Sequence, residues 1–143
     1  MTSSYKNVPD IITKKKVLEL INNNTEASLL VNTRTCDISA IVGDLVMESS
    51  TSVNTVDVAS DNTDLRPVFG IIIEKVDSTT AKILLIGTIS GFSGLTKGNQ
   101  IFLSITGSIT STPPITGYLQ SLGVAKESTE VDFNPKMQRV KRV

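Results

Sequence analysis

Short apolar runs separated by polar turns and glycines fill the chain from Ile38 onward and predict β-strands. Two of these runs, 68–76 and 81–86, flank a polar stretch at 77–80, which is typical of an antiparallel hairpin with a four-residue loop. Apolar residues occupy both parities of both runs, so both faces of the hairpin are predicted to be covered. We expect the domain's own core to cover one face and a helix or a neighbouring subunit to cover the other. The residues assigned to core or oligomer interface are Phe69, Ile71, Ile72, Ile73, Ile83, Leu84, Leu85 and Ile86.

A faint internal repeat indicates that the β region has two related units. The segment 43–46 leads through a Ser/Thr-rich stretch to Phe69-Gly70-Ile71 and a turn at 77–79, and about 55 residues after Gly43 the segment 98–103 leads to Leu122-Gly123-Val124 and a turn at 127–129. Glycine recurs where a strand enters a corner, which suits a backbone that must turn sharply. Two such units are expected to pack as halves of one body, with chance similarity as the alternative.

The first 37 residues are predicted to hold a short amphipathic helix or arm. Val17, Leu20 and Ile21 recur at i, i+3 and i+4, while Lys14, Lys15 and Lys16 fall on the other face. Asp10 is a candidate N-cap, and three asparagines at 22–24 are a candidate stop. The helix is expected to pack on its own domain or to dock on a partner.

A basic tail follows Pro135 and occupies residues 136–143. Apolar side chains interleave its cations, so it is predicted to be either a solvated end or an arm that becomes ordered on a partner. The chain therefore divides into an N-terminal helix or arm at 1–37, a β-rich module at 38–135 and this tail. Attachment to a partner is assigned to Lys14, Lys15, Lys16, Lys136, Arg139, Lys141 and Arg142.

Composition limits the functional classes. The 143 residues suit one domain, and 14 basic side chains balance 14 acidic ones, so no global charge favours nucleic acid or a membrane surface. No apolar run approaches the roughly 18 residues of a membrane span, and the start lacks the apolar region of a secretory signal, so a soluble protein made in a cytoplasm is expected. The single cysteine, Cys36, excludes an internal disulfide and is expected to be buried or half-buried.

Enzymatic motifs are not formed by the residues present. The segment 91–94, Gly-Phe-Ser-Gly, has the wrong spacing for a nucleophile elbow, and the chain has no histidine to act as its base. Lys97-Gly98 inverts the order that a phosphate-binding loop needs. Asp57, Asp61 and Asp64 are a weak calcium candidate beside the more ordinary reading as a solvated acidic loop. We therefore predict a protein that is not an enzyme and has no catalytic, metal or cofactor residues.

A set of ordered segments resembles a β-rich module of tailed-bacteriophage virion proteins, those named head fibre, capsid decoration or tail structural proteins. The resemblance covers about residues 38–135 and rests on the following segments: Val42-Gly43-Asp44-Leu45-Val46, Pro67-Val68-Phe69-Gly70-Ile71, Gly87, Ser90-Gly91-Phe92-Ser93-Gly94-Leu95-Thr96-Lys97-Gly98, Phe102-Leu103-Ser104, Ile109-Thr110-Ser111-Thr112-Pro113-Pro114, and Gln120 with Leu122-Gly123-Val124-Ala125. The chain departs from the similar proteins at Ile101-Phe102, where they usually carry a tyrosine pair.

The resemblance implies a structural virion protein that tends to form trimers. The expected fold is an all-β antiparallel sandwich or barrel with a short N-terminal helix or arm and an extended basic C-terminal tail. The expected partners are copies of itself as a homotrimer and the major capsid or another virion protein, with no membrane, no specific nucleic acid and no cofactor. The alternatives are a neck or tail adaptor that anchors a fibre, and a host-surface adhesion module that binds carbohydrate.

Overall fold

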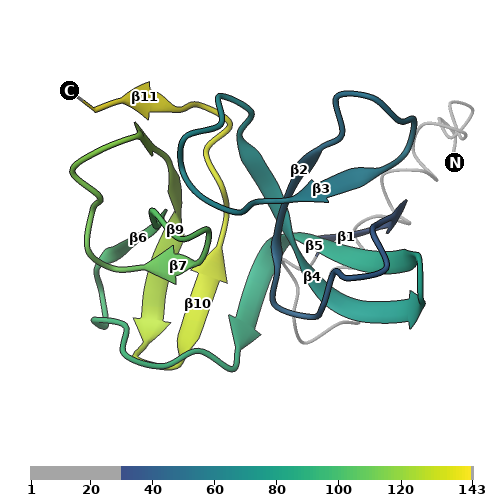
Figure 1. Cartoon of the computed structure of the whole chain (residues 1–143). Helices are drawn as coiled ribbons and strands as arrows, with labels where there is room; N and C mark the ends of the chain where they lie inside the picture. The colour runs from purple at the N-terminus through teal and green to yellow at the C-terminus, as the bar shows by residue number, and fades with distance from the viewer. Residues whose placement is uncertain (1–29, 143) are drawn as a thin grey trace, which may run out of the picture.

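The computed structural model describes residues 30–142, which form an all-β body (Figure 1). This confirms the all-β part of the predicted fold, and residues 30–142 contain no helix. The predicted helix and Lys14, Lys15 and Lys16 lie outside the described residues. The strands are β1 (Leu30–Thr35), β2 (Leu45–Glu48), β3 (Val56–Val58), β4 (Val68–Asp77), β5 (Thr80–Ser90), β6 (Gln100–Leu103), β7 (Ile109–Thr110), β8 (Tyr118–Leu119), β9 (Ser121–Glu127), β10 (Glu130–Phe133) and β11 (Val140–Lys141).

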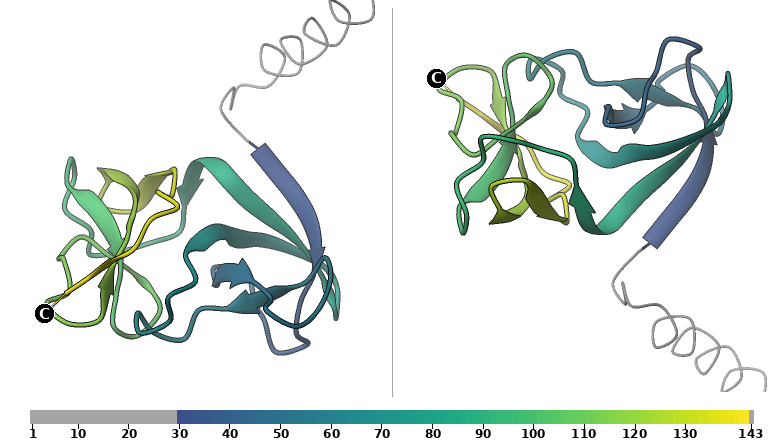
Figure 2. Two further views of the ribbon diagram at one scale, coloured as in Figure 1. Left: turned by 90° about the horizontal axis from the view of Figure 1, so that it is seen from above. Right: turned by 90° about the horizontal axis from the view of Figure 1, so that it is seen from below.

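Nine of the strands form one curled antiparallel sheet. Its order is β3-β2-β4-β5-β10-β9-β6-β7, β1 also pairs with β5, and β8 and β11 form a separate two-stranded sheet. The long strand β5 joins the two halves of the sheet, because residues 80–86 pair with β1 and residues 87–90 pair with β10. The sheet therefore curls into two lobes on either side of β5 (Figure 2).

The two lobes repeat one arrangement of strands. In the first, β2 pairs with β3 and with β4, and β4 forms a hairpin with β5. In the second, β6 pairs with β7 and with β9, and β9 forms a hairpin with β10. We call residues 30–86 the first repeat and residues 87–133 the second repeat. The faint repeat in the sequence thus corresponds to a repeated β unit.

Equivalent backbone contacts mark the start of β2 and β6. Gly43 and Gly98 precede these strands with φ of 99° and 87°, in a region that glycine adopts without steric penalty. The N–H of Gly43 donates to the carbonyl of Ile72 at 2.8 Å, and the N–H of Gly98 donates to the carbonyl of Ala125, also at 2.8 Å. The same glycine therefore fixes the same corner in each repeat.

The strand registers agree as well. Val46 on β2 lies opposite Gly70 on β4, and Ile101 on β6 lies opposite Gly123 on β9. In both repeats the register shifts directly after that pair, as at a β-bulge. A shared irregularity is stronger support for duplication than shared regular strands, because regular pairing is common to all sheets.

Two apolar cores lie on opposite faces of the β4–β5 hairpin. A shared core joins the repeats and consists of Leu45, Met47, Ala59, Val68, Ile71, Leu84, Leu95, Ile101, Leu103, Leu122, Ala125, Val131 and Phe133. A first-repeat core fills the first lobe and consists of Cys36, Ala40, Val46, Val56, Ile72, Ala81 and Ile83. Cys36 is buried, as predicted.

The prediction that both faces of the hairpin are covered is confirmed, but the expected cover is different. The chain covers both faces itself, one with the shared core and one with the first-repeat core. This is possible because β5 continues past the hairpin into the second repeat, which packs on the face that we assigned to a helix or a neighbouring subunit. The hairpin therefore gives no reason to require a partner, and the homotrimer stays a prediction without this support.

Candidate functional site

The residues predicted for core or oligomer interface lie mainly in the core. Ile71, Ile72, Ile83 and Leu84 are at most 1% exposed. Phe69 and Leu85 pack partly buried against the first-repeat core, and Ile73 packs against the shared core. Ile86 is half-buried and pairs with Leu30. These residues therefore leave little apolar surface for a partner.

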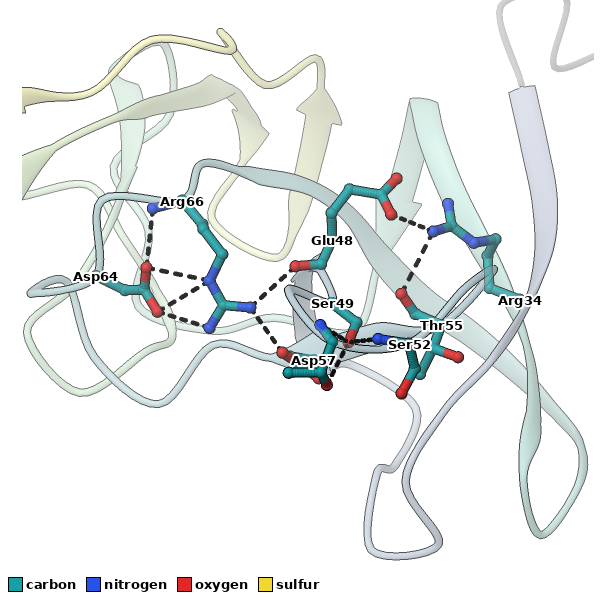
Figure 3. A network of polar contacts seen from close by, with 9 residues as sticks. Arg34, Glu48, Ser49, Ser52, Thr55, Asp57, Asp64 and Arg66 are labelled. Atoms are coloured by element: carbon teal, nitrogen blue, oxygen red, sulfur yellow. Dashed lines mark hydrogen bonds and ion pairs between the residues drawn. The ribbon is translucent and has the colours of Figure 1, made fainter.

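The acidic residues of the weak calcium candidate have other partners. The guanidinium of Arg66 binds the carboxylate of Asp57 at 2.6 Å and that of Asp64 at 2.7 Å (Figure 3). Asp61 accepts hydrogen bonds from the backbone N–H and the hydroxyl of Thr63. Within residues 30–142 no group of three or more acidic, cysteine or histidine side chains is placed to hold a metal ion. The loop is organised by an arginine.

The ion pairs around Arg66 keep its main partner charged. Hydrogen bonds from the side chain and backbone of Arg66 lower the pKa of Asp64 to about 2. The pKa of Arg66 is raised in turn, chiefly by the hydrogen bonds to Asp64 and Asp57. Arg66 also donates to the backbone carbonyl of Glu48 at 2.9 Å, so it holds the loop before β4 against the end of β2.

A second arginine, Arg34, holds β1 against the rest of the first repeat. Arg34 on β1 donates to the carboxylate of Glu48 and to the carbonyl of Thr55 (Figure 3). Its guanidinium also lies 5.2 Å from the ring centroid of Phe69, within the range of a cation–π interaction. The backbone N–H of Thr35 donates to Asn54. These contacts attach β1 to the turn between β2 and β3 and curl the sheet toward closure.

Gln120 joins three parts of the molecule. It lies between β8 and β9 and is 1% exposed. Its Oε1 accepts from the backbone N–H of Val68 at 2.8 Å and from Nε of Arg139 at 3.1 Å. Its Nε2 donates to the carbonyls of Val68 and Lys136, both at 2.7 Å. One side chain therefore ties β4 of the first repeat to the second repeat and to the tail.

The described part of the basic tail contacts its own body. Arg139 is half-buried, donates to the carbonyl of Asp64, and has a pKa lowered chiefly by burial. β11 pairs with β8, and Nζ of Lys141 lies 5.6 Å from the ring centroid of Tyr118. Of the cations assigned to attachment, Lys136 and Lys141 are exposed and Arg142 is half-buried. Arg139 thus serves the joint at Gln120.

Asn62 forms a second joint between the repeats. Its Nδ2 donates to the carbonyls of Thr116 and Tyr118 at 2.8 and 3.2 Å, although the residue precedes them by more than fifty positions. A side chain at Gly117 would collide with this amide. Periodicity and motifs identify neither Asn62 nor Gln120 as a structural residue, and the sequence singles out Gln120 only within the segments of the resemblance. An isolated amide has no pattern that would distinguish it from a solvated loop residue.

No family model matches this chain, and no curated protein matches it either. In residues 30–142 there is no helix whose length and hydropathy would allow it to cross a membrane.

Proposed function

We propose that the chain is a non-enzymatic structural protein of a tailed-bacteriophage virion, of the capsid decoration or head fibre type. The observation that carries the proposal is that the polar side chains with the most hydrogen bonds contact other parts of the chain's own fold. Gln120 and Asn62 bind backbone groups at the joints between the two repeats, and Arg66 binds Asp57 within the first repeat. Such an arrangement serves a rigid building block, in which the polar groups hold repeats together.

The segments that carry the resemblance support the same proposal, because they coincide with the repeated corners. Val42-Gly43-Asp44-Leu45-Val46 enters β2, and the segment ending at Gly98 leads to β6 at the equivalent corner. Leu122-Gly123-Val124-Ala125 contains the glycine beside the register shift of β9. The resemblance therefore rests on residues that determine backbone geometry.

Aromatic side chains give no support to the adhesion alternative. In the described residues Phe102 and Phe133 are buried, and Phe69, Phe92 and Tyr118 are half-buried. Carbohydrate sites usually offer an exposed aromatic face for stacking, and all five of these side chains are at least half-buried. We therefore favour the structural role.

Attachment to the shell is assigned to the basic N-terminal segment. Lys14, Lys15 and Lys16 form the densest run of cations in the sequence, and a cluster of positive charge steers binding to an acidic surface. The test adds purified protein to shells assembled without it and measures bound protein by co-sedimentation. We expect saturable binding that raised salt weakens.

The matched variants separate attachment from general charge effects. Replacing Lys14, Lys15 and Lys16 by glutamine should reduce shell binding, whereas Lys126→Gln on the exposed face of β9 should leave it unchanged. Binding to isolated necks or tails instead of shells would replace decoration by the adaptor role. Binding to none of the three would contradict the proposal.

A further inference from the structure

Three exposed apolar side chains gather in the loop between β1 and β2. Ile38, Ile41 and Val42 are 70%, 63% and 56% exposed. The backbone of their loop is held in place, because Ala40 between them is buried in the first-repeat core and Gly43 is hydrogen-bonded to β4. The apolar side chains are therefore held outward by a fixed backbone.

The second repeat provides an internal comparison for this loop. Counting back from Gly98 as from Gly43, the positions of Ile38, Ile41 and Val42 correspond to Ser93, Thr96 and Lys97, which are exposed and polar. The position of buried Ala40 corresponds to buried Leu95. The repeat thus requires an apolar residue only at the inward position and accepts polar residues at the other three. Folding therefore does not account for the three exposed apolar residues, whereas binding to another surface would.

Charge beside the loop is mainly acidic. Asp37 is exposed within it, and Asp77 lies in the adjacent hairpin, whose Thr79 carbonyl accepts the N–H of Cys36. Hydrogen bonds from Ser39 lower the pKa of Asp37, and hydrogen bonds from residues 79 and 80 lower that of Asp77, so both are charged at neutral pH. The nearby cation, Lys75, has its Nζ bound to the Ala40 carbonyl at 2.7 Å. We call Asp37, Ile38, Ile41, Val42 and Asp77 the loop surface.

The tail carries the complementary combination. Met137 and Val140 are 58% and 55% exposed, and Lys136 and Lys141 are exposed beside them. We call these four residues the tail strip. β11 fixes the strip on the second repeat, while the loop surface belongs to the first repeat, so the two surfaces lie on different halves of the molecule (Figure 1). They are too far apart along the fold to be one patch.

We propose that the loop surface of one copy binds the tail strip of the next copy, head to tail. Apolar side chains on both surfaces would leave water together, and Asp37 and Asp77 would face Lys136 and Lys141. Such a contact is heterologous, so it generates a closed ring if the rotation between copies closes and an open chain if it does not. The proposal concerns self-association alone and does not depend on the virion role.

Two variants test it, one for each surface. In the loop variant, Ile38→Ser, Ile41→Thr and Val42→Lys introduce the residues that the second repeat already carries at the equivalent positions. In the strip variant, Met137→Ser, Val140→Thr and Lys141→Glu change side chains and leave the backbone pairing of β11 in place. Ile115→Ser, at another exposed apolar position, is the control. Circular dichroism and melting curves establish that each variant folds.

Analytical ultracentrifugation then gives distinct outcomes. The wild type and the control should self-associate, and each surface variant should do so about tenfold more weakly or not at all. Mixed together, the two variants should form a one-to-one dimer that grows no further, because each supplies the surface that the other lacks. Raised salt should weaken association of the wild type.

Several results would overturn the proposal. A wild type that stays monomeric over the tested concentrations would contradict self-association. The loop surface would then bind the chain's own N-terminal segment or another protein. A strip variant that associates as well as the wild type would indicate contact between like surfaces. If a variant fails to fold, carbodiimide cross-linking of mixed isotope-labelled and unlabelled wild type decides instead. Links between copies from Lys136 or Lys141 to Asp37 or Asp77 are expected, and their absence in associated protein contradicts the contact.

Discussion

Buried amides hold the two repeats together at the scale of single residues. Gln120 satisfies both polar groups of Val68 while also binding Arg139 and Lys136. A buried polar group that loses its partner costs more than the hydrogen bond was worth, because it is left without water as well. Stability at this joint therefore depends on one side chain.

Replacing Gln120 with methionine tests this dependence. The variant keeps the length of the side chain but leaves the N–H and carbonyl of Val68 unpaired, so we expect a loss of about 3 kcal/mol in the free energy of unfolding. Gln100→Met is the matched control, since Gln100 is exposed on β6. Denaturant titration measures both, and equal stability of the two variants would contradict the role of Gln120.

The Arg66 ion pairs predict how stability depends on acid. The pKa of Asp64 is about 2 in the folded protein against an ordinary value of 3.8, so its charged form is favoured by folding. The resulting stabilisation is complete above about pH 4 and is lost as the pH falls toward 2. Asp64→Asn should lessen the fall in melting temperature over this interval, because the other acids with lowered pKa values remain. Asp132 contacts Thr88, and Asp132→Asn should leave the fall unchanged. An unchanged acid profile in Asp64→Asn would refute the effect.

At the scale of elements, the β4–β5 hairpin is the centre of the fold. Its two faces belong to two cores, so residues of either parity are buried. Ile72→Asp and Leu84→Asp each place an unpaired charge in a different core, and each should cost several kcal/mol of stability. Val76→Asp on β4 is the control, because Val76 is 51% exposed. Melting curves that show one tolerated substitution would mean that only one face is tightly packed.

Local patterns were enough to predict the strands of this hairpin and the place of the turn, because apolar runs and polar turns are properties of neighbouring residues. The predicted four-residue loop was wrong: Asp77 pairs with Thr80, so the turn holds only residues 78 and 79. The repeat was also visible, since glycines at its corners recur with the strands that follow them. The sequence did not show which segment covers the second face of the hairpin. It depends on β5 continuing into the second repeat, and no local pattern shows which distant strand will pair with residues 87–90.

The contacts of the buried polar side chains could not be predicted from local sequence either, and the reason is physical. Asn62 and Gln120 act through partners that are more than fifty positions away in sequence. The tail cations were recognised from charge alone, which does not distinguish half-buried Arg139 from exposed Lys141. Charge locates candidate residues, and only the fold determines which of them face solvent.

At the scale of the whole molecule, the repeats form one cooperative unit. The shared core draws residues from both repeats, and β5 belongs to both. Calorimetry of the full chain should therefore show a single unfolding transition whose calorimetric and van't Hoff enthalpies agree. Two resolved transitions would mean that the lobes are independent domains joined by a strand.

The structural role of the whole molecule is tested most directly by locating the chain in an intact particle. Cryo-electron microscopy of purified particles is expected to show density for the two-lobed β body in multiple symmetry-related copies, seated on the shell. Neighbouring copies in contact should place the loop surface against the tail strip. Particles that are complete and infectious without any density or peptide from this chain would contradict the proposed function.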